Sequence, residues 1–106
     1  MRVETWNIEE MTGYKPISTF YEDLSIADVF GADAIKDTFD RVVQSWLNDY
    51  RMFTEFVMAL NWKCWRWYNQ NDALSELYAD LYYKAHDLAC ENFNEDELIY
   101  FYRTLD

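Results

Sequence analysis

Side chains that commonly perform acid–base or metal chemistry are sparse in this sequence. His86 is the only histidine among the 106 residues, and it follows Tyr82 by four positions and precedes Asp87. A structural or surface role is more common for such a residue than acid–base catalysis. A di-metal site in a helical protein needs Glu-x-x-His pairs, but position 83 is Tyr83 and there is no second histidine.

Motifs for other reactions are missing as well. The chain contains 2 Gly and 1 Pro, and it has no glycine-rich phosphate loop, no nucleophile elbow and no Ser/His/Asp set. We therefore predict a protein that is not an enzyme, with no catalytic residues, no cofactor and no metal site.

The two cysteines, Cys64 and Cys90, lie in helical patterns without a Cys-x-x-Cys motif or a nearby histidine. We expect both to be buried free thiols, because a disulfide is unusual in a cytoplasmic chain. A cytoplasmic location is expected because no apolar run near the N-terminus resembles a secretory signal and none approaches the roughly 20 residues of a membrane span.

Residues 62–68, WKCWRWY, alternate cations with aromatic rings, a composition that in other proteins stacks on single-stranded nucleic acid. Helical geometry would spread these rings around the axis, and the net charge of −11 opposes binding to phosphates. We predict instead that Lys63 and Arg66 lie across neighbouring rings or pair with carboxylates, without direct contact to nucleic acid or a membrane.

Apolar residues recur at three- and four-residue steps from Asp33 to the end of the chain, which predicts an all-α protein. Breaks are expected at Asn48-Asp49 and at residues 69–72, and Asn94 with Glu97 forms a capping box for the last helix. The residues of that helix expected to point inward are Leu98, Phe101, Tyr102 and Leu105. The predicted architecture is a single domain, 1–106. It consists of an irregular or partly helical N-terminal arm with short helical turns at 1–31, and a compact bundle of about four helices at 33–106.

Both glycines, Gly13 and Gly31, and the only proline, Pro16, lie within the arm or at its edge. Pro16 is expected to keep Lys15 extended, and Ser25 is expected to cap a short helix that Gly31 ends. Three residues are expected to pack one side of that helix, namely Ile26, Val29 and Phe30.

The helix expected at about 50–69 is apolar on two faces. One face forms a core stripe, and its members are Phe53, Phe56, Val57, Leu60, Cys64 and Trp67. The opposite face presents Met58, Trp62 and Trp65, bordered by Arg51, Glu55 and Arg66. Either the N-terminal arm, through residues such as Trp6, Met11 and Tyr21, covers this second face, or the face binds another subunit or another protein. The candidate interaction surface is Met58, Trp62, Trp65 and Arg66.

Acidic residues follow helical spacing between positions 72 and 91. This candidate acidic face consists of Asp72, Glu76, Asp80, Asp87 and Glu91. A solvated helix face explains it most simply. The alternative is an acidic mimic of nucleic acid, for which one stripe is too sparse, because four helical residues advance about 6 Å whereas duplex DNA carries one charge per roughly 1.7 Å.

Several segments also resemble a group of small, acidic, uncharacterised proteins encoded on bacterial mobile elements and phages. They are Tyr14–Phe20, Ser25–Gly31, Ala34–Phe39 and Tyr100–Thr104. The resemblance implies a bacterial cytoplasmic setting and no known activity. We expect a non-enzymatic protein that acts through protein–protein contact as a homo-oligomer, or alternatively an acidic inhibitor that occupies the nucleic-acid-binding surface of another protein.

Overall fold

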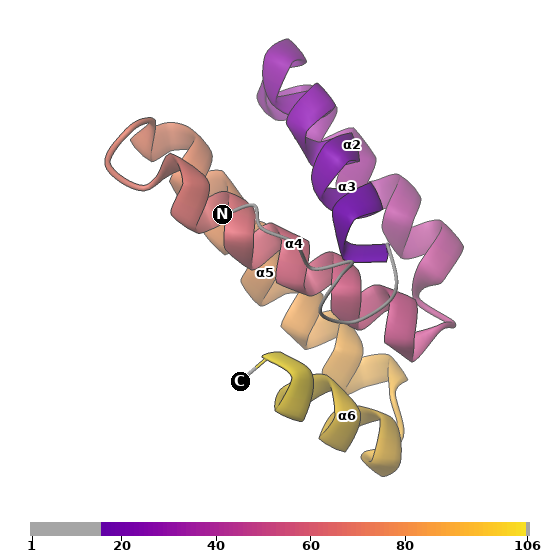
Figure 1. The fold of residues 1–106 in the computed structure, drawn as a ribbon. Coiled ribbons are helices and arrows are strands. Elements are labelled where there is room, and N and C mark those ends of the chain that lie inside the picture. The colour runs from indigo at the N-terminus through magenta and orange to yellow at the C-terminus, as the bar shows by residue number, and fades with distance from the viewer. Residues whose placement is uncertain (1–15, 106) are drawn as a thin grey trace.

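The computed structural model describes residues 16–105, with side chains from residue 19 onward. This part of the chain is all-helical and contains no strand (Figure 1). Its five helices are α2 (Pro16–Phe30), α3 (Ala32–Trp46), α4 (Tyr50–Trp67), α5 (Asp72–Asn92) and α6 (Glu95–Leu105). The described helices include none that combines the length and apolar character needed to cross a lipid bilayer.

Side-chain caps set the starts of three helices. Asp49 accepts from the backbone N–H groups of Arg51 and Met52 at the start of α4, and Asn71 accepts from that of Leu74 at the start of α5. The predicted capping box of α6 is confirmed, because Asn94 Oδ1 accepts from the Glu97 N–H at 2.9 Å while Glu97 Oε1 accepts from the Asn94 N–H at 3.0 Å.

The segment before Gly31 differs from the prediction. Residues 16–30 form one continuous helix, so the described chain has one helix more than the four expected. Pro16 begins α2, a position where its fixed φ fits and its missing N–H costs no hydrogen bond. Ser25 is not a cap: it lies inside α2, and its hydroxyl donates to the carbonyl oxygen of Tyr21 at 2.8 Å. The predicted break at Gly31 is confirmed, with φ of 108°.

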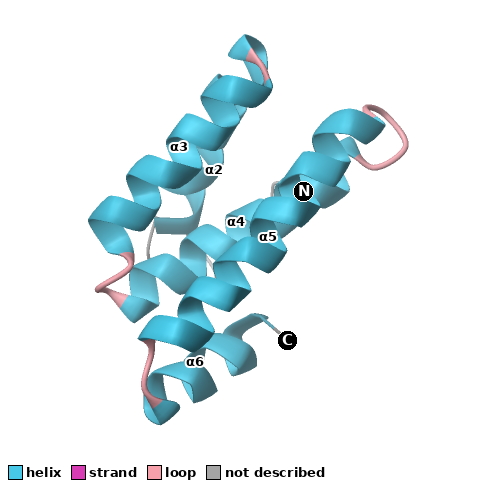
Figure 2. Ribbon diagram, turned by 180° about the vertical axis from the view of Figure 1, so that it is seen from behind, coloured by secondary structure: helices cyan, strands magenta, loops and turns pink. Residues whose placement is uncertain are grey.

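Two antiparallel helix pairs make up most of the fold, α2 with α3 and α4 with α5, and the short α6 packs against α4 (Figures 1 and 2). α4 is the central element because it contacts each of the other four described helices. The structure therefore depends on α4 to hold the two pairs together.

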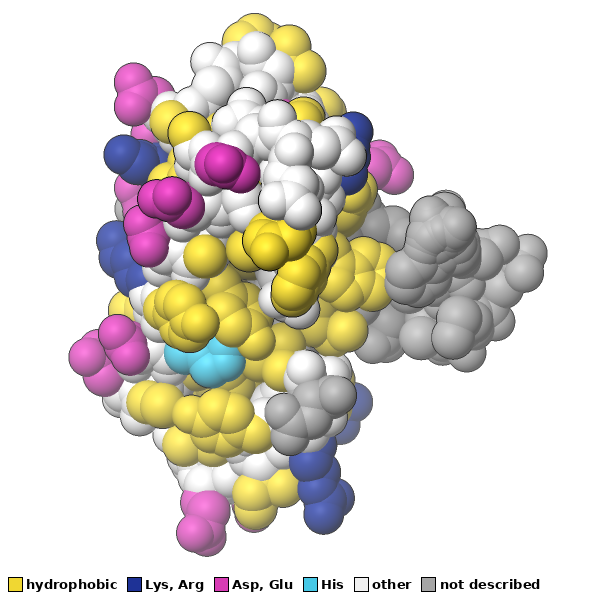
Figure 3. Space-filling view, turned by 90° about the vertical axis from the view of Figure 1, so that its left-hand side faces the viewer, with side chains coloured by type: hydrophobic (Ala, Val, Ile, Leu, Met, Phe, Trp, Pro, Cys, Tyr) yellow, Lys and Arg dark blue, Asp and Glu magenta, His cyan; other side chains and the backbone are white. Residues whose placement is uncertain are grey.

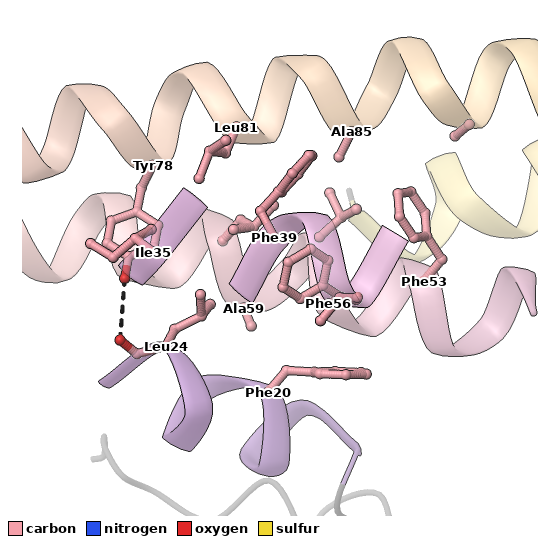
Figure 4. Packing of buried hydrophobic residues seen from close by; sticks show 14 of the residues in the cluster. Phe20, Leu24, Ile35, Phe39, Phe53, Phe56, Ala59, Tyr78, Leu81 and Ala85 are labelled. Carbon is pink, nitrogen blue, oxygen red and sulfur yellow. Dashed lines mark hydrogen bonds between the residues drawn. The ribbon is translucent and has the colours of Figure 1, made fainter. Parts of the chain in front are cut away.

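Aromatic rings fill the space around α4 (Figure 4). The Phe56 ring lies 5.4 Å from that of Phe20 on α2, 5.8 Å from Phe39 on α3 and 6.3 Å from Phe53 on its own helix, measured between ring centroids. The predicted core stripe is confirmed for Phe53, Phe56, Val57 and Leu60, which are fully buried, whereas Cys64 and Trp67 at its C-terminal end are half-buried.

Three expectations about burial are wrong. Glu55, expected among the charged residues that border the second apolar face of α4, is buried. Cys90 is exposed, and Tyr102, expected to point inward from the last helix, is partly exposed. Both cysteines are free, as predicted, and Cys64 is half-buried.

Candidate functional site

A buried polar cluster joins α2 to α4 and α5. The carboxylate of Asp28 on α2 lies 2.7 Å from the ammonium Nζ of Lys63 on α4. The same Oδ2 atom accepts from the indole N–H of Trp67 at 3.1 Å, and Oδ1 accepts from the hydroxyl of Tyr78 on α5 at 2.5 Å. The side chains of Lys63 and Asp28 are only 4% and 7% exposed. We call Asp28, Lys63, Trp67 and Tyr78 the Asp28 cluster.

The electrostatics of the cluster follow from its burial. Burial lowers the pKa of Lys63, and the hydrogen bond and charge of Asp28 oppose that shift. Burial also raises the pKa of Tyr78, and the neighbouring Asp28 carboxylate raises it further. Tyr78 is therefore a neutral donor over the whole physiological range. The ammonium of Lys63 lies 4.4 Å from the centroid of the Tyr21 ring, which adds a cation–π contact.

These contacts suit the Asp28 cluster to a structural role. Asp28 Oδ2 accepts two hydrogen bonds and Oδ1 one, and the partners come from two other helices. The two hollows described below are lined by other residues. The prediction that Lys63 and Arg66 pair with carboxylates or lie across rings is confirmed, because Arg66 lies 4.6 Å from the centroid of the Trp67 ring.

The structure divides the predicted interaction surface on α4. Met58 and Trp62 are half-buried, and the Trp62 ring meets that of Tyr21 at 6.4 Å, so a residue of the predicted arm does contact this face. Trp65 is 64% exposed, and its ring meets that of Tyr68 at 5.4 Å. Trp6 and Met11 lie outside the described residues.

The exposed end of α4 is thus an apolar surface of Trp65 and Tyr68 beside the exposed Arg66. All members of the predicted acidic face, Asp72, Glu76, Asp80, Asp87 and Glu91, are exposed along α5.

His86 lies in an aromatic setting where α5 meets α6. Its Nδ1 is 2.9 Å from the carbonyl oxygen of Tyr82, and its ring lies 4.4 Å from that of Tyr82 and 5.0 Å from that of Phe101. Figure 3 shows this only histidine among hydrophobic side chains. The Tyr102 hydroxyl and the Cys90 thiol are 3.0 Å apart nearby, and that hydrogen bond raises the pKa of Tyr102. Between residues 16 and 105, no three side chains of the metal-binding types come together.

The side of α2 that was expected to pack against the fold is exposed. Phe20, Leu24 and Ala27 face the core, while Ile26, Val29 and Phe30 on the other side are 61%, 82% and 77% exposed. The spacing of these three residues correctly indicates one side of a helix, but the prediction that this side packs is wrong, because it faces away from the core. They lie at the end of α2 that leads into the turn to α3, at the top of Figure 1.

No protein-family model, curated protein or solved structure matches this chain in comparisons with known proteins.

Proposed function

We propose that this chain is a non-enzymatic protein that acts by binding other proteins, and that it assembles as a homo-oligomer through the exposed end of α4. The exposure of Trp65 is the observation that supports this most strongly. Large apolar side chains that stay exposed together are typical of interaction sites, and tryptophan, tyrosine and arginine are enriched in the residues that dominate binding energy. The resemblance to mobile-element and phage proteins favours a bacterial host protein as a further partner.

Charge favours α4 as the element on which two copies meet. The chain carries −11 overall, so most contacts between copies bring carboxylates together. α4 exposes two cations, Arg51 and Arg66, and no acid, because its single acid, Glu55, is buried, as is its third cation, Lys63. Electrostatic repulsion between two copies is therefore weakest along α4. Arg66, next to Trp65, can form an ion pair with a carboxylate of the other copy.

Analytical ultracentrifugation tests the assembly. We expect the wild type to sediment as a dimer or larger species, and the double variant Trp65→Ser, Tyr68→Ser to dissociate with a Kd at least about tenfold higher. Tyr83→Ser is the matched control, since Tyr83 on α5 is 67% exposed and should be dispensable. A wild type that is monomeric at high micromolar concentration, or equal Kd values for all three proteins, would overturn self-association through α4.

The exposed carboxylates along α5 support a second candidate, an acidic inhibitor of a nucleic-acid-binding protein. A single helix presents charges too sparsely to imitate a duplex, so this function needs the several acidic faces that an oligomer supplies. Competition with duplex DNA for a purified non-specific DNA-binding protein tests it. The inhibition should weaken steeply as salt is added, and inhibition that salt does not change would exclude the mimic.

A further inference from the structure

The helix pair α2–α3 carries a hollow of about 340 Å³ next to the exposed apolar end of α2. Its walls are Asp23, Ile26, Ala27 and Phe30 from α2, and Ala34, Asp37, Thr38 and Arg41 from α3. We call this hollow the α2–α3 groove. It lies at the small end of the size range of binding pockets, which suits a few anchoring side chains of a protein partner.

Two features of the groove indicate a protein helix as its occupant. The apolar part is a short strip formed by Ile26, Ala27 and Phe30, which lie within about one turn of α2, together with Ala34 of α3. An amphipathic helix binds such a strip with side chains spaced three and four residues apart. Phe30 is both a wall of the groove and 77% exposed, so a partner can bury it without displacing the core.

The charged residues in the walls of the groove indicate which charge the bound helix should carry. The charged side chains in its walls are two acids, Asp23 and Asp37, and one base, Arg41, and all three are exposed. Arg41 is already engaged in part, since its Nη2 donates to the Thr38 hydroxyl at 3.2 Å. A basic partner therefore complements the rim, whereas a second copy of this chain brings another −11 against it.

A second hollow gives a useful comparison. It measures about 310 Å³, lies between α3 and α5, and has two lysines and two aspartates in its walls, Lys36, Lys84, Asp40 and Asp80. Those charges balance one another, and the ammonium of Lys84 lies 5.5 Å from the centroid of the Phe39 ring. It therefore lacks the combination of an exposed apolar strip and an acidic rim.

We infer that the α2–α3 groove binds an amphipathic helix of another protein whose apolar stripe packs on Ile26 and Phe30 and whose flanking lysines or arginines face Asp23 and Asp37. This inference rests on the proposed function only in that the chain acts by binding protein, and it uses a different surface from self-association through Trp65.

Titration of the isotope-labelled full chain with a synthetic amphipathic peptide, leucine on one face and lysine on the other, tests the inference by NMR. We expect shift changes concentrated in residues 23–41. A matched peptide with glutamate in place of lysine should bind at least about tenfold more weakly. Shift changes centred on the acidic face of α5 would mean that the peptide adsorbs by charge alone, and would overturn the inference.

Two variants with a matched control sharpen the test. Phe30→Ser should weaken binding of the lysine peptide about tenfold, while Ile99→Ser, which changes an exposed apolar residue on α6, should leave it unchanged. Asp37→Lys reverses the charge of the rim, so it should weaken the lysine peptide and strengthen the glutamate peptide. Circular dichroism confirms folding, and unchanged affinities in both groove variants would contradict the inference.

Sedimentation of the same proteins separates this inference from the proposed function. If Phe30→Ser disrupts self-association while the double variant Trp65→Ser, Tyr68→Ser does not, a second copy fills the groove and the basic helix is excluded. If the wild type is monomeric but the lysine peptide binds at residues 23–41, the α4 assembly fails and the groove inference stands. If the protein self-associates and no peptide shift appears in this region, only the groove inference fails.

Discussion

Among the individual residues, Asp28 is the one whose side chain links α2 to α4 and α5. It contacts Lys63, Trp67 and Tyr78, which belong to the α4–α5 pair. A buried ion pair gains little net stability over well-packed apolar residues, but removing one partner leaves a charge in an apolar setting. The Asp28 cluster therefore specifies where α2 lies along α4 more than it adds to overall stability.

Replacing Asp28 with asparagine should lower the free energy of unfolding by about 3 kcal/mol, because the buried ammonium of Lys63 loses its counter-charge. Urea denaturation followed by circular dichroism measures the loss. Asp23→Asn is the control, since Asp23 is an exposed carboxylate on the same helix, and it should change stability by less than about 0.5 kcal/mol. Equal losses in the two variants would show that the cluster has no special role.

The raised pKa of Tyr78 predicts that the folded protein loses stability in alkaline solution. The pKa of Tyr78 lies above the usual 10.0, first because of burial and then because of Asp28. Above about pH 10 the unfolded chain releases a proton that the folded chain retains, so this group lowers stability by about 1.4 kcal/mol per pH unit. The raised pKa of Tyr21 acts in the same direction, while the lowered pKa of Lys63 acts in the opposite direction until its unfolded value of 10.5.

Tyr78→Phe isolates this contribution. The variant should lose stability less steeply than the wild type between about pH 10 and pH 11, by up to about 1.4 kcal/mol per pH unit. Urea midpoints across that range measure the slope. Tyr83→Phe serves as the control because Tyr83 is exposed, and its slope should match that of the wild type. Parallel slopes for Tyr78→Phe and the wild type would contradict the assignment.

At the level of elements, one backbone position separates α2 from α3. Gly31 has φ 108° and ψ −171°, a conformation that is almost exclusive to glycine, and its N–H donates to the carbonyl oxygen of Ala27. This conformation lets the chain reverse within one residue and start α3 at Ala32. The α2–α3 groove therefore depends on Gly31 as well as on its own walls.

Gly31→Ala should destabilise the fold by about 1–3 kcal/mol through backbone strain alone. A Cβ at this position meets no atom within 4 Å, so steric collision adds nothing. Thermal and urea unfolding measure the change. Gly31→Asn is the companion variant, and it too should be destabilised, because this conformation lies outside the left-handed helical region that asparagine tolerates. Stability equal to that of the wild type in both variants would exclude strain as the reason for glycine.

At the scale of the whole molecule, α4 unites two helix pairs through rings that meet at Phe56. Each of its partners, Phe20, Phe39 and Phe53, is itself buried. The molecule should therefore unfold as one cooperative unit, with α2 and α3 losing their packing together with α4.

Phe56→Ala tests that cooperativity. The variant should lose about 3–5 kcal/mol of unfolding free energy by opening a cavity between three helices. Ile99→Ala, on the exposed side of α6, should lose less than about 1 kcal/mol. Far- and near-ultraviolet circular dichroism should report the same midpoint in each protein. Separate midpoints for secondary structure and ring packing would show that the helix pairs unfold independently.

Local sequence signals were enough to place α4, α5 and α6, and they predicted α3 except for its start, where Asp33 lies inside the helix and does not cap it. Asp49, Asn71 and Asn94 cap their helices through bonds to backbone groups two or three residues away, and apolar spacing sets the core face of α4. These signals depend on near neighbours in the chain, so they can be recognised without a fold. Local signals alone gave the wrong start for the helix before Gly31, because Ser25 resembles an N-cap although it lies inside α2.

Which polar residues are buried and which apolar residues are exposed depends on the packing of helices that are distant in the chain. Asp28 and Lys63 are 35 residues apart, and nothing in their local spacing pairs them. The burial of Glu55 and the exposure of Phe30 likewise depend on where α2 and α3 lie relative to α4. Burial is a property of packing between distant segments, and helical periodicity defines faces without saying which of them another helix covers.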